Sequence, residues 1–481
     1  MRRWARVLAF GLAGSAGLAL LLAAALHLYV GQRSMTPPDV GDVGEVGGPA
    51  RKRENGFIRM RGGVREVHLR GSPKELGAAH GALLQDRMME NEGELWGTFE
   101  KVVPLAPARF LFLDLARLQY RHVDGNLPKA RAVELSAEAR AVANDRFASK
   151  VPTYERLVLL HALYDIALSF EQSRFVGCST FGLGPAATRD GHTLLARAFD
   201  FEAGEAFDRD KAVYFVAGDG TIPFASVAWP GLVGVVSGMN REGLAVVVHG
   251  GRAGPVHKAG VPLVFSMRGV LEQAKDVDEA AAILSREAVM VSHIVIAADA
   301  KGHFAVVERA PGSPATVRRD FADPSRVAVT NHFEGPLAAD PKNDSVRRNT
   351  TTLARRARLD EMLATLGPSE GDVPRAVAML RDHRCAGGAA CALGDRRAID
   401  ALIATHGIVA DTTAKVLWVS AGPGLSGQFV GLDLNEAFTA TPDAPPSPAP
   451  TVAADPAAES AEYNEVRARA RGLGQARGDK R

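Results

Sequence analysis

The chain has 481 residues, and its 57 Lys plus Arg residues nearly balance its 55 Asp plus Glu residues, giving a formal net charge of +2 at pH 7. So small a charge offers no electrostatic reason to expect a nucleic acid or an acidic partner, and no nucleic-acid partner is predicted. Three cysteines are too few for a disulfide framework and lack the spacing of a zinc site. The predicted activity needs neither a metal nor an organic cofactor. Because both ends of the chain have a non-globular composition, one domain of about 380 residues is expected.

The N-terminus carries an apolar run from Val7 to Val30, preceded by Arg2, Arg3 and Arg6. At about 1.5 Å per residue this run can cross a hydrocarbon core of about 30 Å. The arginines predict a cytoplasmic N-terminus and an exported domain. Two interpretations of residues 1–31 stay open. The segment is either an inner-membrane anchor with the domain in the periplasm, or a signal segment whose removal gives a secreted protein.

Residues 32–56 are rich in Pro, Gly and charge and are predicted to form a flexible linker. Folding is expected to begin at Phe57, with a strand over Val64–Leu69. The sequence Ser72-Pro73-Lys74-Glu75 then predicts a helix that begins with a capping box. His80 lies in this helix between two glycines, which favours close helix packing over a catalytic role. Residues 57–177 are therefore predicted to form a helical N-terminal segment, with later helices over Arg109–His122, Pro128–Ala148 and Thr153–Phe170.

After Cys178 the pattern changes to short strand-like runs separated by Gly, Asp and Pro turns. Two helical stretches, Val264–Glu287 and Val346–Leu366, interrupt these runs, and a shorter one follows at Val373–Arg384. Grouped rather than alternating helices and strands predict an α+β layered fold for residues 178–438. The Pro- and Ala-rich residues 439–481 are predicted to be disordered. The predicted strands are Thr193–Phe201, Ala212–Ala217, Phe224–Trp229, Val233–Ser237, Leu244–His249, Ser292–Ala297, His303–Glu308, Arg326–Thr330, Gly407–Val409 and Val416–Ser420.

The junction between Gly177 and Cys178 separates these two regions. If the thiol of Cys178 cut this peptide bond, Cys178 would become a new N-terminus. Its own α-amine, with an ordinary pKa of about 7.7 to 8.0, could then accept the thiol proton. Gly177 favours such a cut, because a residue without a Cβ leaves its carbonyl open and tolerates a strained backbone.

The motifs around and beyond this junction resemble the N-terminal-nucleophile hydrolases that include isopenicillin-N acyltransferase (peptidase family C45) and, more distantly, bile salt hydrolases and penicillin V acylases. In that family an Arg-x-x-Asp motif follows the cysteine by about twenty residues, as Arg197 and Asp200 follow Cys178. The likeness extends from Val64 to Leu434. The other matching motifs are the Gly71–Gly81 opening, the Gly238–Leu244 hairpin, Thr330-Asn331-His332 and the closing Val409–Pro423 hairpin.

The resemblance implies an αββα sandwich preceded by a helical segment, self-cleavage at Gly177/Cys178 and two chains that stay associated. It implies that Cys178 is the nucleophile, that Asp200 holds the α-amine or thiol, and that Arg197 lowers the thiol pKa. It also implies that Asn331 donates its side-chain amide to an oxyanion.

Two features depart from the family pattern. Where bile salt hydrolases carry a second oxyanion asparagine, this chain has His249 and Gly250, whose backbone N–H groups could substitute. The family's arginine on the downstream helix has five competitors here, which are Arg347, Arg348, Arg355, Arg356 and Arg358. The two remaining cysteines, Cys385 and Cys391, could form a disulfide or remain free thiols.

The sequence therefore predicts an enzyme that hydrolyses, or transfers the acyl group of, a small-molecule acyl amide through a thioester on Cys178. Hydrolysis is favoured, because no feature suggests a CoA phosphate site. Two alternatives remain. One is a membrane-tethered binding protein on the same fold. The other is a papain-like protease that would pair Cys178 with His249 or His332.

Overall fold

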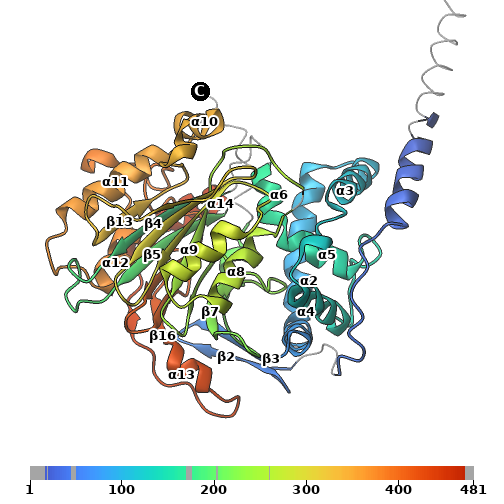
Figure 1. Ribbon diagram of the computed structural model, residues 1–481, viewed down its shortest axis with the longest axis horizontal. Helices are drawn as coiled ribbons and strands as arrows, with labels where there is room; N and C mark the ends of the chain where they lie inside the picture. Colours follow the sequence, from blue (N-terminus) through green and yellow to red (C-terminus); the bar gives the residue numbers. More distant parts are fainter. Residues whose placement is uncertain are drawn as a thin grey trace, which may run out of the picture.

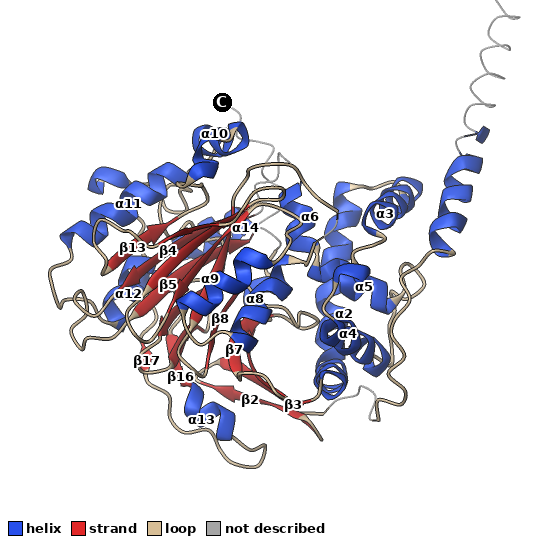
Figure 2. Ribbon diagram, in the orientation of Figure 1, coloured by secondary structure: helices blue, strands red, loops and turns tan. Residues whose placement is uncertain are grey.

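Two β-sheets lie face to face at the centre of the computed structural model (Figures 1 and 2), which describes residues 17–18, 20–44, 50–169, 176–201, 204–258 and 260–471. The larger sheet has ten strands in the order β1-β2-β3-β6-β7-β8-β9-β10-β11-β12, and the smaller has seven in the order β13-β4-β5-β14-β15-β16-β17. Neighbouring strands run antiparallel except for β3 and β6, which are parallel. The strands are β1 Lys52–Arg53, β2 Gly56–Arg61, β3 Val64–Gly71, β4 Val176–Leu183, β5 Leu194–Phe201, β6 Ala212–Gly218, β7 Phe224–Ala228, β8 Ser237–Asn240, β9 Ala245–Gly250, β10 His293–Ala298, β11 Phe304–Arg309, β12 Thr316–Arg318, β13 Arg326–Val329, β14 Ala404–Asp411, β15 Val416–Ser420, β16 Phe429–Asp433 and β17 Thr451–Val452.

The hydrophobic core has three parts, because strand side chains alternate between the two faces of each sheet. The central part fills the space between the sheets and includes Phe215 and Ile296 from one sheet and Leu195 and Ile408 from the other. The two outer parts lie under helices. Helices α2, α8 and α9 pack on the ten-stranded sheet, and α11 and α12 on the seven-stranded sheet. The predicted α+β, αββα four-layer sandwich with a helical N-terminal segment is thus confirmed.

Some stretches that the sequence predicts as a single helix form two helices in the structure. The stretch Val264–Glu287 forms α8 and α9, because Asp276 accepts hydrogen bonds from the N–H groups of Asp278 and Glu279 and so begins a new helix. The stretch Val346–Leu366 likewise spans α10 and α11. The helices are α2 Pro73–Val102, α3 Ala106–Tyr120, α4 Lys129–Ala141, α5 Thr153–His161, α6 Leu163–Ser169, α7 Ala206–Arg209, α8 Leu263–Gln273, α9 Val277–Arg286, α10 Pro341–Asn349, α11 Thr352–Thr365, α12 Val373–Leu380, α13 Leu434–Thr439 and α14 Ala461–Arg471, with short 3₁₀ turns η1 Asp124–Asn126, η2 Pro336–Ala339, η3 Ala386–Gly388 and η4 Pro456–Glu459.

The N-terminal segment supplies strands as well as helices. Strands β2 and β3 extend the larger sheet, and α2 then begins with the predicted capping box between Ser72 and Glu75. Gly77 and Gly81 lie against α4, where a Cβ on Gly77 would be 2.0 Å from the carbonyl oxygen of Glu134. The close packing predicted from these glycines is therefore present.

Residues 20–31 are helical and lie against α3, where His27 Nδ1 is 3.0 Å from the carboxylate of Asp114. The part of the predicted apolar segment before residue 17 lies outside the described residues. Within the described ranges, no helix is both long and apolar enough to span a membrane. The predicted linker contacts the domain, since Ser136 donates a hydrogen bond of 2.7 Å to the carbonyl of Pro38 and Met35 is buried.

The disorder predicted for residues 439–481 is wrong over most of this tail. Strand β17 pairs with β16, and α14 packs on the domain with Tyr463 buried against Ser426. Two arginines of α14, Arg467 and Arg471, form ion pairs with Glu205 and Asp208. Composition alone could not reveal these distant acidic partners. Residues 472–481 lie outside the described part.

Candidate functional site

Cys178 lies near the start of β4, and its side chain enters the space between the two sheets. The thiol is fully buried, and its Sγ is 4.0 Å from the carbonyl oxygen of Val248 on β9 of the opposite sheet. Its cross-strand neighbour on β5 is Phe199. The predicted nucleophile is therefore at the interface between the sheets, not on an exposed strand.

Arg197 reaches this thiol from β5. Its Nη2 is 3.2 Å from Cys178 Sγ, and the guanidinium also donates to Ser237 Oγ and to the carbonyl groups of Val236 and Val248. The guanidinium is fully buried and stacks 4.3 Å from the ring centroid of Phe199. A surface ion pair with Asp200 is thus excluded for Arg197, because its hydrogen bonds all point into the interface between the sheets.

Asp200 lies beside the predicted scission bond. It is the cross-strand partner of Gly177, and a Cβ on Gly177 would be only 3.2 Å from Asp200 Oδ2. This approach is tighter than most side chains accept, so glycine gives the carboxylate access to the Gly177–Cys178 peptide. The structure therefore brings Asp200 to the Gly177–Cys178 peptide bond.

Asn331 and Arg355 hold the backbone of Cys178 from the other side. Asn331 Oδ1 accepts a hydrogen bond of 2.8 Å from the Cys178 N–H and one of 2.9 Å from Arg355 Nη2. Arg355 Nη1 donates to the carbonyl of Cys178 and, at 3.0 Å, to Ser179 Oγ. Among the five arginines that the sequence left open, Arg355 of α11 is the one that contacts the Cys178 backbone.

The side-chain amide of Asn331 is not directed as the resemblance implies. Its Nδ2 donates to the carbonyl of Gly250 at 3.0 Å and is therefore not directed at an oxyanion in the intact chain. Its Oδ1 orients the Cys178 nitrogen. The imidazole of His249 also points elsewhere, with Nε2 2.7 Å from Thr180 Oγ1 and Nδ1 3.2 Å from the Thr330 carbonyl. The prediction that backbone N–H groups of His249 and Gly250 bind an oxyanion stays a prediction.

The papain-like alternative finds no support in this geometry. His332 Nδ1 contacts the hydroxyl groups of Thr330 and Thr352. With His249 also turned away, neither imidazole is hydrogen-bonded to the Cys178 thiol among the described residues.

Tyr164 is a site residue that the sequence did not indicate. It is a buried residue of α6, and its pKa lies well above the ordinary value because of burial first and the nearby Cys178 second, opposed by Arg197 and the Gly250 N–H. Its ring stacks on Phe199, the cross-strand neighbour of Cys178, with centroids 6.5 Å apart. Nothing in the helical pattern around Tyr164 distinguishes it from an ordinary core residue.

Burial raises the pKa of the Cys178 thiol above its ordinary value. The charges of Arg197 and Arg355 lower this pKa, whereas the carboxylate of Asp200 raises it. Arg197 thus lowers the thiol pKa, as expected, but the desolvation of the buried thiol raises this pKa by more. In the intact chain the thiol is protonated at neutral pH.

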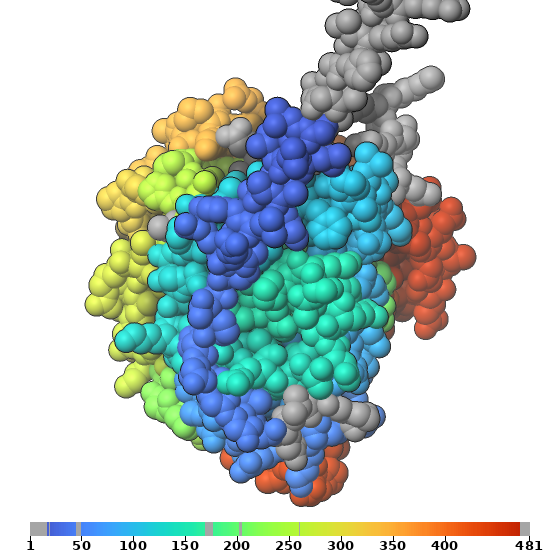
Figure 3. Space-filling view, turned by 90° about the vertical axis from the view of Figure 1, so that its right-hand side faces the viewer, coloured from blue at the N-terminus to red at the C-terminus, as the bar shows by residue number. Residues whose placement is uncertain are grey.

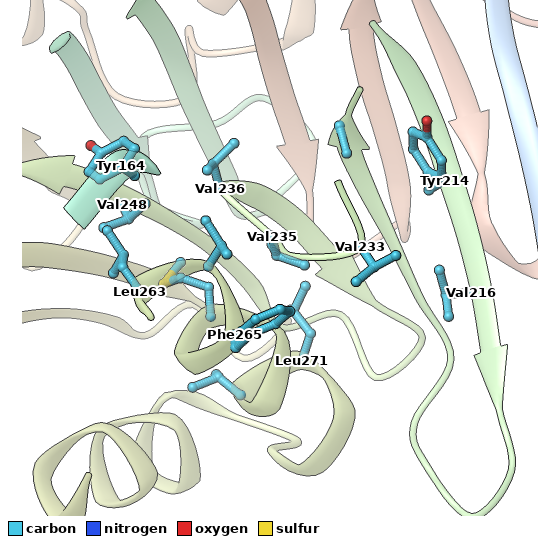
Figure 4. Packing of buried hydrophobic residues seen from close by; sticks show 14 of the residues in the cluster. Tyr164, Tyr214, Val216, Val233, Val235, Val236, Val248, Leu263, Phe265 and Leu271 are labelled. Atoms are coloured by element: carbon cyan, nitrogen blue, oxygen red, sulfur yellow. The ribbon is translucent and has the colours of Figure 1, made fainter. Parts of the chain in front are cut away.

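An apolar cavity of about 100 Å³ is lined by neighbours of the site residues. Phe199 is the cross-strand partner of Cys178, Val236 accepts a hydrogen bond from Arg197, and Tyr164 stacks on Phe199; all three line one side of the cavity. Helices α2 and α5 of the N-terminal segment form the opposite side through Met88, Leu157 and other residues. Figure 4 shows Tyr164 and Val236 within the surrounding hydrophobic cluster. The lining suits an apolar group rather than a charged one.

Buried neutral histidines fix the loop that lines this cavity. The N–H of Gly231 donates to His80 Nε2 at 3.0 Å, and the N–H of Val233 donates to His161 Nε2 at 2.9 Å. Both imidazoles are fully buried, and desolvation lowers the pKa of His80 to about 3 and that of His161 to about 4. Each ring must stay unprotonated to accept its hydrogen bond.

These histidines predict a loss of stability in acid. Below a pH of about 6.5 the unfolded chain binds protons that the folded His80 and His161 refuse, so the free energy of unfolding should fall as the pH falls toward 4. Asp165, whose pKa burial raises to about 7, works in the opposite direction. We expect His161 alone to account for about 2 kcal/mol between pH 6.5 and pH 5.

Urea unfolding at the two pH values measures this effect. His161→Gln keeps a hydrogen-bond acceptor without the titrating ring, so its stability should change less with pH than that of the wild type. Equal pH slopes for the two proteins would contradict the assignment.

Two groups of side chains in the described residues have the composition of a metal site. One is Asp190, His192 and Asp411, where His192 Nδ1 is already 2.9 Å from the Asp411 carboxylate. The other contains Cys385 and Cys391, which form a disulfide with Cα atoms 5.5 Å apart. Neither group includes a residue that contacts Cys178.

Comparison with known proteins agrees with the predicted resemblance. Residues 187–386 match the acyl-coenzyme A:6-aminopenicillanic acid acyl-transferase family, and this range includes Arg197, Asp200, Asn331 and Arg355. An uncharacterised protein of Archaeoglobus fulgidus is 27% identical over 284 residues, which is 54% of this chain and 46% of the relative. This chain therefore spans about half the length of that relative.

Solved structures with similarity to the chain carry low scores. A Caenorhabditis elegans N-acylethanolamine-hydrolyzing acid amidase ortholog gives a TM-score of 0.38 at 18% identity, with 49% of this chain and 93% of that chain covered. A conjugated bile acid hydrolase mutant from Clostridium perfringens gives 0.34 at 12%, with 57% and 96% covered. Penicillin V acylase from Agrobacterium tumefaciens gives 0.33 at 16%, with 53% and 91% covered.

Proposed function

We propose, from the match of residues 187–386 to an acyl-transferring family and the contacts around Cys178, that this protein is a self-cleaving N-terminal cysteine amidohydrolase. The observation that carries the proposal is the convergence of Arg197, Asp200, Asn331 and Arg355 on one buried cysteine and on its peptide bonds. Four polar side chains from β5, from the residues after β13 and from α11 meet around a single buried cysteine, and such a cluster is more typical of a reaction centre than of packing.

The first reaction would be scission of the chain. The Cys178 thiol adds to the Gly177 carbonyl, the C–N bond breaks as the Cys178 nitrogen takes up a proton, and Gly177 is left as a thioester. Water then hydrolyses the thioester to the Gly177 carboxylate and a free thiol. Asp200, which lies beside Gly177, would accept the thiol proton and pass it to the nitrogen.

The second reaction would reuse the same atoms. Asn331 Oδ1, which accepts the N–H of Cys178 in the intact chain, would accept a hydrogen from the new α-amine and turn its lone pair toward the thiol. The thiolate attacks the carbonyl of an acyl amide, the amine leaves with a proton, and water releases the acid from the thioester. Arg197 would stabilise the thiolate by its positive charge.

The cavity indicates the substrate class. Its apolar lining includes Phe199, the cross-strand neighbour of Cys178, so the acyl part of the substrate would lie there. A volume of about 100 Å³ is smaller than the ~150 Å³ cavity that admits benzene. Short apolar acyl chains would therefore fit without rearrangement, and longer chains would need the cavity to open.

Mass spectrometry of the protein after brief exposure to N-acyl amides tests the proposal. We expect two fragments that meet at Gly177/Cys178, and an added acyl mass on the Cys178 fragment. Butanoyl and hexanoyl amides should label faster than hexadecanoyl amides. A protein that stays intact and gains no acyl mass with any chain length would overturn the proposed function, and intact protein that binds the amides reversibly would favour the binding-protein alternative.

A further inference from the structure

Large apolar side chains are exposed together on one part of the surface. In the helical residues 17–18 and 20–31 they are Leu18, Leu20, Leu21, Leu22, Leu28 and Tyr29. From the end of α2 through α3 they are Val102, Leu105, Phe110, Leu111, Phe112 and Leu115, and the exposed fractions in both groups lie between 41% and 71%. Elsewhere in the described residues only Met60, Val256, Val317 and Leu353 are exposed in this way. These two groups are called the apolar patch below.

The two helices of the apolar patch are neighbours. His27 packs on Phe110 with ring centroids 6.2 Å apart and is hydrogen-bonded to Asp114, which is buried. Figure 3 shows the N-terminal helix and α3 next to each other on one face of the molecule. On the inner side of α3, Arg117 pairs with Glu155 at 2.6 Å. The polar groups of α3 are thus satisfied inside, and its apolar side chains are left outside.

We infer that the apolar patch lies in the interface of a lipid bilayer, with α3 as a second contact beside the N-terminal helix. Contiguous exposed apolar surface of this extent marks a site of interaction. Lipid is favoured over a protein partner because the first group of the patch belongs to the apolar run Val7–Val30. This run contains no Asp, Glu, Lys or Arg. Aromatic side chains with basic neighbours, here Phe110 and Phe112 near Arg109, are typical of helices that lie in a membrane interface.

The patch and the cavity share helix α2. Its residues Met88 and Leu95 line the cavity, and its last residue, Val102, belongs to the patch. If the protein has the proposed function, on which this consequence rests, a bilayer held against α3 would present acyl amides dissolved in lipid to the helical layer that covers Cys178.

Single introduced thiols test the contact in the full-length protein. Cys178 is buried and Cys385 is bonded to Cys391, so a cysteine at an exposed position is the one that a reagent reaches. We would compare Phe112→Cys with Val317→Cys, on edge strand β12, each carrying an environment-sensitive fluorophore in phosphatidylcholine–phosphatidylglycerol vesicles. At position 112 we expect blue-shifted emission and at least about twofold quenching by nitroxide-labelled lipid, with no change at position 317.

The possible outcomes separate the occupants of the patch. Equal spectra at positions 112 and 317 overturn the inference. A label at position 112 that is quenched neither by iodide nor by lipid nitroxide also overturns it, because a protein then covers the patch. The experiment needs no turnover, so it stands even if the proposed activity fails. If the activity holds, Phe112→Asp should slow hydrolysis of bilayer-dissolved long-chain amides about tenfold and leave short soluble amides unchanged, whereas Val317→Asp should change neither.

Discussion

Replacement of Cys178 by alanine should abolish both scission and turnover. The alanine variant is expected to run as one full-length band, and its amidase rate should fall at least about 1,000-fold, because no other group replaces a lost nucleophile. The fold should persist, since Cys178 is one small buried side chain of a large core. Denaturing gels and a fluorogenic acyl amide measure the two effects, and thermal unfolding confirms that the variant is folded.

Cys178→Ser provides the matched control for this result. A hydroxyl of nearly the same shape can add slowly to the Gly177 carbonyl, so partial scission over days is expected, with little turnover. Cleavage of the alanine variant at the same position as in the wild type would show that another protease cuts the chain. The self-cleavage hypothesis would then be wrong.

Replacement of Arg197 by methionine should have the second largest effect. Arg197 lowers the pKa of the Cys178 thiol, so its loss should raise that pKa and move the acidic limb of the kcat/KM profile to higher pH. At pH 7 we expect activity to fall about 100-fold, a size typical of the loss of one charged group at a reacting atom. The pH–rate profile of the processed enzyme is the deciding measurement.

This variant also loses hydrogen bonds to the carbonyl groups of Val236 and Val248, so stability must be controlled. Arg309→Met removes another buried arginine, which bonds the Glu287 carbonyl at 2.8 Å and does not contact Cys178. We expect Arg309→Met to destabilise the fold by a similar amount and to leave the pH–rate profile unchanged. Arg197→Lys, which keeps a positive charge, should shift the pH–rate profile less than Arg197→Met. If the pH–rate profile of Arg197→Met is not shifted, Arg197 does not lower the thiol pKa in the reaction and its proposed role is wrong.

The sequence by itself determined the layered fold, the cysteine and most of its neighbours. Alternating apolar residues located the central strands, and the capping box at Ser72 located the start of α2. The resemblance of the Arg197-x-x-Asp200 and Thr330-Asn331-His332 motifs to the family implied that these residues share a site with Cys178, and the pairing of β4 with β5 and with β13 brings them together.

Other features depended on contacts between segments that are distant in sequence, and only the tertiary structure decided them. Five arginines compete between residues 347 and 358, and the register of α11 against β4 brings Arg355 to the Cys178 backbone. Tyr164 is an ordinary helical residue until α6 is buried against Phe199, and the tail is held by contacts with distant segments, among them β17 with β16 and Arg467 with Asp208. Local patterns record propensity and spacing, whereas burial, desolvation and ion pairing arise only when the chain has folded.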